Sequence, residues 1–349
     1  MSKILVVGGA GYVGPVLISR LKAGSPDRFV GGIDAGWFAD QCDGIGPLPE
    51  VLYDDFRFVD VRDVTAEHLS GYDSVVYLAA ISNDPMGSQF GLLTSQINRH
   101  EAARLATLAR QTGARNFVLA SSASVYGRGD GDRTETSSLD PQTDYARSKL
   151  GAESDIGALA RPGFRVTSLR FATACGWSPR VRLDLVLNDF VASALTTGCI
   201  AVLSDGSPWR PLIHVEDMAR AVEWALSEDR DLQPDNVVVN VGSAQWNFQI
   251  KQLADAVADV LGGVSVSVNS KAAPDTRSYR LDFSLWQRIA PRHQPEVTLE
   301  AAIQELATNL SEGPSRVTSD FRTSARIRLK RLQELIDAGF LDRELRWAK

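Results

Sequence analysis

The first fourteen residues constrain the fold more than any other stretch of the chain. Four consecutive aliphatic residues, Ile4–Val7, run into closely spaced glycines, and apolar residues then recur at helical spacing. This pattern predicts a strand buried on both faces of a parallel sheet, followed by a tight turn and a helix. Gly8, Gly11 and Gly14 stand where a backbone can turn sharply, admit a pyrophosphate to the main chain and pack a helix on the sheet. The anion would lie at the N-terminus of that helix.

A second apolar stretch, residues 29–33, ends in Asp34. An acidic side chain at this distance from the glycines can accept hydrogen bonds from the hydroxyls of an adenosine ribose, and it repels a 2′-phosphate. Together the glycines and Asp34 predict a site for NAD rather than NADP. Each feature alone has a simpler interpretation, since glycine clusters are often plain turns and Asp34 could begin a turn with Gly36.

Composition narrows the class of protein. The 349 residues carry a formal net charge of −6, which disfavours a binder of nucleic acid or of an anionic membrane. Three scattered cysteines suit a reducing cytoplasm, and neither they nor the four distant histidines have the spacing of metal ligands. The chain enters its first predicted strand at once and has no long apolar run, so we expect neither a signal peptide nor a membrane span.

Strands and helices alternate as far as about residue 170. Predicted strands begin at Phe58, Val75, Phe117 and Phe164, and long helices are predicted over 90–112 and 143–161. This alternation predicts an α/β fold with a doubly wound parallel Rossmann sheet, and the looser rhythm beyond predicts a smaller irregular α+β substrate domain. The predicted division is 1–175 for the Rossmann domain, with 214–242 returning to it, 176–213 and 243–310 for the substrate domain, and 311–349 for a linker and C-terminal helical tail.

The C-terminal tail is basic. Such a pattern is typical of the solvated face of a peripheral helix. Its basic residues are Arg322, Arg326, Arg328, Lys330 and Arg331.

Tyr145 and Lys149 are four residues apart and so share one face of a predicted helix. Tyrosine is a poor base at neutral pH, but a close ammonium and an oxidised nicotinamide would both favour the phenolate and lower its pKa. Lys149 could also hold the nicotinamide ribose, and Ser122, at the end of the preceding strand, could donate a hydrogen bond to a substrate oxygen. The pair alone would fit a surface helix, but its place after the glycine turn and Asp34 favours catalysis.

These motifs resemble the extended short-chain dehydrogenase/reductases, in the branch of NAD-dependent nucleoside-diphosphate-sugar epimerases and dehydratases. The resemblance covers most of residues 4–285 and implies NAD as cofactor, a nucleoside-diphosphate sugar as substrate, and a homodimer formed by the helix from Phe90 and the helix with Tyr145. It implies catalysis by Ser122, Tyr145 and Lys149. The cofactor-binding residues that it implies are Gly8, Gly11, Tyr12, Val13, Gly14, Asp34, Asp60, Val61, Leu78, Ala79, Ala80, Asn98 and Lys149. The substrate-binding residues that it implies are Ser122, Ser124, Thr173, Asn188, Arg210 and Arg277.

Two arginines have a physical case as well as a family one. Arg210 and Arg277 would present paired guanidinium forks, which suit the two phosphates of a sugar nucleotide. A surface ion pair is the alternative for each of them.

Departures from the family pattern narrow the reaction. Dehydratases that form 4-keto-6-deoxy sugars resemble one another in a Thr-Asp-Glu before Val-Tyr-Gly, where this chain has Ser122, Ala123 and Ser124. Alanine and serine cannot supply the acid and base for water loss, so this dehydration is disfavoured. Bifunctional epimerase-reductases usually have a cysteine in this loop, and Ala123 disfavours that activity too. At the position of Thr173 many relatives have an asparagine that contacts the sugar, so this chain differs from them at that contact.

We therefore predict an NAD-dependent nucleotide-sugar epimerase that works through a transient 4-keto intermediate. The alternative enzyme is an NAD(P)H-dependent reductase of 4-keto sugars. The alternative of another class is a cofactor-sensing binding protein that keeps the fold without the chemistry, against which the intact Ser122, Tyr145 and Lys149 count.

Overall fold

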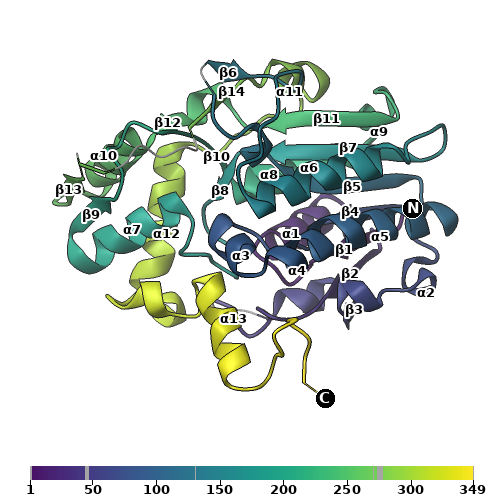
Figure 1. The fold of residues 1–349 in the computed structure, drawn as a ribbon, viewed down its shortest axis with the longest axis horizontal. Coiled ribbons are helices and arrows are strands. Elements are labelled where there is room, and N and C mark those ends of the chain that lie inside the picture. The colour runs from purple at the N-terminus through teal and green to yellow at the C-terminus, as the bar shows by residue number, and fades with distance from the viewer. Residues whose placement is uncertain (1, 44–46, 130, 270, 273–277, 349) are drawn as a thin grey trace.

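The centre of the protein is a seven-stranded parallel sheet, seen in a computed structural model that describes residues 2–43, 47–129, 131–269, 271–272 and 278–348. Its strand order is β11-β7-β5-β4-β1-β2-β3 (Figure 1). The order reverses between β1 and β4, and ligands of such sheets bind at the carboxyl ends of the strands beside this reversal. The predicted doubly wound Rossmann sheet is confirmed. Its strands are β1 (Ile4–Val7), β2 (Val30–Asp34), β3 (Asp55–Phe58), β4 (Ser74–Tyr77), β5 (Asn116–Ser122), β7 (Arg165–Phe171) and β11 (Asn236–Val241).

Helices cover both faces of this sheet, with α5 and α6 in front of it in Figure 1 and α1 behind. One apolar core joins α1 (Gly14–Gly24) and α8 (Val215–Ala225) to the sheet, and a second joins α5 (Ala102–Gln111) and α6 (Asp144–Gly157) to its other face. The buried aliphatic strands predicted from sequence therefore lie between two helical layers. The shorter helices around the main sheet are α2 (Ala66–Leu69), α3 (Asp84–Gln89), α9 (Glu228–Asp231) and α11 (Ser284–Ile289).

Two predicted elements differ from the observed ones. Strand β3 ends at Phe58, where the prediction began it, because Asp60 accepts a hydrogen bond from the Arg62 amide at 2.9 Å and caps the short turn η2 (Val61–Asp63). The long helix predicted over 90–112 is instead α4 (Gly91–Ser95), the π-helical segment η3 (Gln96–Glu101) and α5 in succession. Wide turns of this kind often mark functional sites.

A third apolar core lies in the part of the chain beyond β7. Helices α7 (Val186–Thr197), α10 (Ile250–Leu261) and α12 (Leu299–Ser311) pack around it. In the small sheets outside the main one, β10 pairs with β8 and with β12, β9 pairs with β13, and β6, which precedes β7, pairs with β14. Their strands are β6 (Asp132–Arg133), β8 (Thr173–Cys175), β9 (Cys199–Val202), β10 (Trp209–His214), β12 (Asn247–Gln249), β13 (Ser265–Val268) and β14 (Arg280–Leu281).

The basic C-terminal tail is not a solvated face, which corrects the sequence-based interpretation. Figure 1 shows α13 (Arg328–Asp337) and the C-terminal end, in yellow, beside the β2–β3 edge of the main sheet. Leu332 and Leu335 join the core on that side of the sheet, and Arg326 and Arg331 pair with Asp43 and Asp40. The tail docks because its leucines need burial and the loop after β2 supplies carboxylates.

Within the described part of the chain, no helix is both long enough and apolar enough to cross a membrane.

Candidate active site

A cavity of about 740 Å³ opens at the carboxyl ends of the central strands. Most of the residues that the sequence singled out line it, although they come from segments up to two hundred residues apart. The predicted site residues that line the cavity are Gly8, Gly11, Tyr12, Val13, Asp34, Asp60, Val61, Leu78, Ala79, Ala80, Ser122, Ser124, Tyr145, Lys149, Thr173 and Arg210.

The glycine turn between β1 and α1 forms the floor of the cavity. Gly8 has a φ of +93°, and a Cβ there would lie 2.4 Å from the Ala79 nitrogen, so only glycine fits this crossing of two chain segments. Gly14 does not line the cavity. A Cβ on Gly14 would lie 2.0 Å from the Gly9 carbonyl oxygen, so its role is to let α1 begin directly against the turn. The result is a bare backbone facing the cavity at a helix N-terminus, which suits a phosphate.

Asp34 stands at the end of β2 with its carboxylate held in place. Its Oδ2 accepts a hydrogen bond from the Ala10 amide at 3.0 Å, and its Oδ1 accepts one from the Gly36 amide at 2.7 Å. Burial raises the pKa of Asp34, and these two hydrogen bonds oppose the rise. The oriented carboxylate beside a glycine cradle fits an adenosine ribose and pyrophosphate, so the residues present fit NAD.

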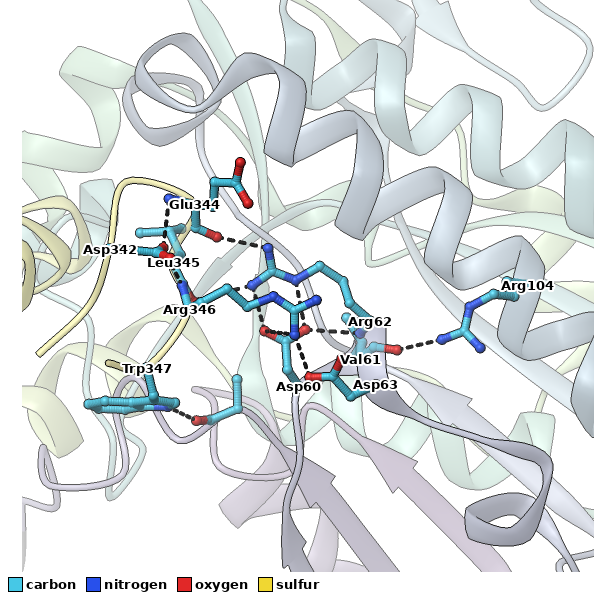
Figure 2. A network of polar contacts seen from close by, with 11 residues as sticks. Asp60, Val61, Arg62, Asp63, Arg104, Asp342, Glu344, Leu345, Arg346 and Trp347 are labelled. Carbon is cyan, nitrogen blue, oxygen red and sulfur yellow. Dashed lines mark hydrogen bonds and ion pairs between the residues drawn. The ribbon is translucent and has the colours of Figure 1, made fainter. Parts of the chain in front are cut away.

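Asp60 lies at the same edge of the cavity and is engaged with Arg62, whose Nη2 is 2.6 Å from Asp60 Oδ2 (Figure 2). Burial opposes ionisation of Asp60, but the hydrogen bonds from Arg62 hold its pKa below the usual value. Arg62 also donates to the Glu344 carbonyl oxygen at 2.8 Å. Asp60, which the resemblance predicted to bind the cofactor, is thus tied through Arg62 to the C-terminal end of the chain.

Ser122, Tyr145 and Lys149 meet where β5 ends beside the start of α6. The Thr143 hydroxyl caps α6 by accepting from the Ala146 amide at 3.2 Å, which places Tyr145 on the first helical turn and Lys149 one turn later. The Lys149 ammonium is only 2% exposed and donates to the Ala120 carbonyl oxygen at 2.8 Å. Burial lowers the pKa of Lys149 to about 8.

The pKa of Tyr145 is raised in the protein without NAD, so the lowering expected from Lys149 is not seen there. Burial raises the pKa, and this outweighs the lowering by the hydrogen bond with Ser122 and by the charge of Arg182. Lys149 contributes no resolved lowering because its ammonium is turned toward Ala120, 5.7 Å from the centre of the Tyr145 ring. The phenol is therefore protonated at neutral pH in the protein alone, and the cation of a bound nicotinamide would favour its ionisation.

Two residues that were predicted to contact a ligand instead form hydrogen bonds that hold neighbouring loops in place. Asn98, in η3, exchanges hydrogen bonds of 2.9 Å with both backbone groups of Ile81 and donates to Ser148 Oγ at 3.0 Å. Asn188 similarly accepts from the Gly176 amide and donates to the Gly176 and Arg182 carbonyl oxygens. Neither residue lines the cavity, because each carboxamide is used to brace a loop behind its wall. Arg277 lies outside the described residues.

The sequence analysis missed a group of cavity residues, here called the facing wall, which comes from the loops after β4 and β8 and from the C-terminal tail. Arg182 pairs with Asp184 at 2.7 Å and donates to Ser82 Oγ at 2.9 Å, and Asp184 accepts from Asn83 at 2.6 Å. Arg328, from the C-terminal tail, lines the same wall. The pattern Arg180-Val-Arg182-Leu-Asp184 in a loop after a strand was the available signal; Arg328 had none, since its neighbours are far away in sequence.

No three histidine, cysteine, aspartate or glutamate side chains gather as a metal site would require, within the residues that the structure describes.

The chain is similar in sequence to nucleotide-sugar enzymes. The profile of the NAD dependent epimerase/dehydratase family matches residues 4–242. A Bacillus subtilis (strain 168) protein, named uncharacterized UDP-glucose epimerase YtcB, is 27% identical over 326 residues, which cover 88% of this chain and 98% of that protein. The dTDP-glucose 4,6-dehydratase of Streptomyces griseus is 28% identical over 294 residues, which cover 82% of this chain and 87% of the enzyme.

Solved structures give the same result for the fold. MoeE5 in complex with UDP-glucose and NAD superposes with a TM-score of 0.73 at 26% identity, covering 88% of this chain and 98% of that one. The NAD-dependent NDP-hexosamine 5,6-dehydratase TunA superposes with a TM-score of 0.76 at 24% identity, covering 90% and 99%. Epimerases and dehydratases thus stand at similar distances from this chain.

Proposed function

The chain belongs to the NAD-dependent epimerase/dehydratase family, and on this premise we propose that it epimerises a nucleoside-diphosphate sugar through a transient 4-keto sugar, with no net oxidation. The observation that carries the proposal is the turn after β5. Ser122 is followed there by Ala123, which is fully buried, and by Ser124, whose hydroxyl accepts from Ser122 at 2.9 Å. The turn therefore presents hydroxyls to the sugar and no carboxyl group for removing water.

The three catalytic side chains divide the proton chemistry. Tyr145 removes the proton from the C4 hydroxyl of the sugar and later returns it to the C4 oxygen. Ser122 redirects its hydrogen bond from Ser124 to that oxygen and so orients it. Lys149 holds the ribose of the nicotinamide and so keeps the nicotinamide beside the sugar. NAD, when bound, supplies a hydride acceptor that gives the hydride back.

The phosphates of the substrate have a proposed partner in Arg210, which lines the cavity from β10. An arginine fork can hold a diphosphate while the sugar turns over between the two hydride transfers. Anchoring at the nucleotide alone is what an epimerase needs, because both faces of the sugar must reach the same site.

The experiment is to incubate the purified protein with UDP-, GDP-, ADP- and dTDP-glucose in turn, and to follow product stereochemistry by NMR and absorbance at ~340 nm, the reduced-nicotinamide band. We expect a C4 epimer from one nucleotide and no lasting absorbance change. Stoichiometric use of added NADH or NADPH on a 4-keto sugar, without any epimer, would establish the reductase instead. Formation of a 4-keto-6-deoxy sugar would establish a dehydratase, with Asp84 of the cavity wall as the first carboxylate to mutate.

We also propose that the protein is a homodimer formed by α4 and α6 of two copies. Leu92, on α4, is 91% exposed and is a side chain that a second copy could cover. Light scattering should give twice the mass of one chain, and Leu92→Asp should shift the protein to the monomer. A wild-type monomer at working concentration would contradict the dimer.

A further inference from the structure

The C-terminal segment 321–347, here called the strap, adds Arg322 and Arg328 to the lining of the cavity, and near each of its ends it is anchored to a residue that lines the cavity. At the substrate end Arg322 pairs with Asp189 of α7 at 2.7 Å. At the adenosine end Trp347 donates its indole N–H to the Ala35 carbonyl oxygen at 2.6 Å, and Arg346 pairs with Asp63 (Figure 2). Between these two ends the strap carries Arg328 into the cavity wall.

Arg328 is buried without a counter-charge. Its side chain is 2% exposed, and its guanidinium carbon lies 4.3 Å from the centre of the Phe38 ring. Nη2 donates to the Arg180 carbonyl oxygen at 2.8 Å, whereas Nη1 is buried with no hydrogen-bond partner. Among the residues that the structure describes, no carboxylate lies within ion-pair distance of Arg328. An unpaired buried charge is strongly unfavourable unless a ligand completes it.

The charged groups around Arg328 are already committed to one another. Arg180 pairs with Glu50 and Arg182 pairs with Asp184, each at 2.7 Å, and Asp34 accepts its two backbone amides. Burial, reinforced by the charges of Arg182 and Arg180, lowers the pKa of Arg328 to about 9. Of the three arginines Arg180, Arg182 and Arg328, only Arg328 has no carboxylate within ion-pair distance among the described residues. This favours an anionic ligand beside Arg328.

The position of Arg328 indicates which anion. It lies within electrostatic reach of Asp34, at the adenosine end, and of the Arg182–Asp184 pair, whose Arg182 in turn acts on Tyr145 at the reacting end. The group of NAD that lies between its adenosine and its nicotinamide is the pyrophosphate. A guanidinium fork matches phosphate oxygens, and the 2′-phosphate of NADP would meet the Asp34 carboxylate instead.

We propose that Arg328 binds the pyrophosphate of NAD together with the glycine turn, so that the strap holds the cofactor in the cavity. The glycine turn offers neutral backbone amides, and the strap adds the positive charge that this turn lacks. The strap's anchors at Ala35 and Asp189 fix Arg328 over the middle of the cofactor.

The test is equilibrium binding rather than turnover. NAD, ADP-ribose and adenosine are titrated into the full chain by calorimetry, directly or in competition, for the wild type and for Arg328→Met. We expect NAD and ADP-ribose, which both contain the pyrophosphate, to bind roughly tenfold to a hundredfold more weakly to the variant, and adenosine to bind equally to both. The cofactor-free melting temperature should not fall, because the variant removes an uncompensated buried cation.

The matched control is Arg331→Met, which removes an arginine of the same helix that pairs with Asp40 and does not line the cavity. It should leave NAD affinity unchanged. Unaltered NAD affinity in Arg328→Met would overturn the proposal, and so would an equal loss for adenosine, which would indicate a collapsed wall. If Arg328→Met does not fold, Arg328→Lys keeps the charge without the fork, and wild-type NAD affinity in that variant would overturn the proposal as well.

Discussion

The two walls of the cavity are built in different ways. On the sheet wall, the glycine turn and the Tyr145–Lys149 pair are each a short local motif, and Asp34 ends the strand that follows the helix after the glycine turn. On the facing wall, Arg328 donates to a carbonyl oxygen 148 residues earlier, and Arg182 donates to the Ser82 hydroxyl 100 residues earlier. Local pattern therefore specifies the sheet wall, whereas only tertiary packing specifies the facing wall.

The difference extends to electrostatics. The sheet wall holds its charged groups with backbone atoms, as Asp34 does with two amides and Lys149 with the Ala120 carbonyl. On the facing wall, Arg182 and Asp184 pair with each other, whereas Arg328 donates to a backbone carbonyl oxygen. We infer that the sheet wall performs the chemistry and the facing wall retains the ligands.

The largest expected effect is on turnover, in Tyr145→Phe. The change removes only the hydroxyl that moves the proton, so turnover should fall roughly a hundredfold to ten-thousandfold while NAD affinity and melting temperature stay at their wild-type values. Steady-state kinetics with the sugar nucleotide that the panel identifies, together with calorimetry, would measure both. Near-normal turnover would mean that Tyr145 is not the acid–base residue.

A smaller effect is expected on cofactor choice, in Asp34→Ala. The wild type should prefer NAD over NADP because the Asp34 carboxylate repels a 2′-phosphate. The variant should lose roughly tenfold to a hundredfold of that preference, mainly by losing affinity for NAD and ceasing to repel NADP. Calorimetric titration of both cofactors checks this. A wild type with equal affinity for the two would show that Asp34 does not select the cofactor.

The smallest expected effect is on stability, in Lys149→Met. Because burial lowers the pKa of Lys149 to about 8, the native protein holds this charge unfavourably at pH 7. As pH rises above 8 the native lysine loses its proton before the unfolded one does, so this penalty fades. The stability advantage of Lys149→Met over the wild type should therefore shrink between pH 7 and 10, by about 1–3 kcal/mol.

Denaturant unfolding at the two pH values measures this change. Lys251→Met is the matched control, since Lys251 lies on the surface with its side chain 56% exposed, and its stability difference from the wild type should stay constant. If the difference in unfolding free energy between Lys149→Met and the wild type does not narrow, the Lys149 charge is compensated in the native protein.

The same contrast explains what the sequence could predict. Four aliphatic residues before a glycine turn predicted the parallel sheet, and a tyrosine four residues before a lysine predicted the catalytic pair. Each prediction succeeded because its pattern is contained in one short segment of the chain. The basic tail was misinterpreted because arginine spacing along one helix does not reveal that Asp40 and Asp43 lie opposite. Asn98 was assigned to the ligand because its position was visible and its hydrogen bonds with Ile81 were not.

The direct test of the epimerase is the fate of the hydrogen at C4. The sugar nucleotide that the panel identifies is prepared with deuterium at C4 and converted by the protein in ordinary water, and the product is examined by NMR and mass spectrometry. If the hydride leaves and returns inside the closed cavity, the epimer keeps its deuterium at C4. Loss of the deuterium to added cofactor or to water, or its movement to another carbon, would contradict redox-neutral epimerisation at C4.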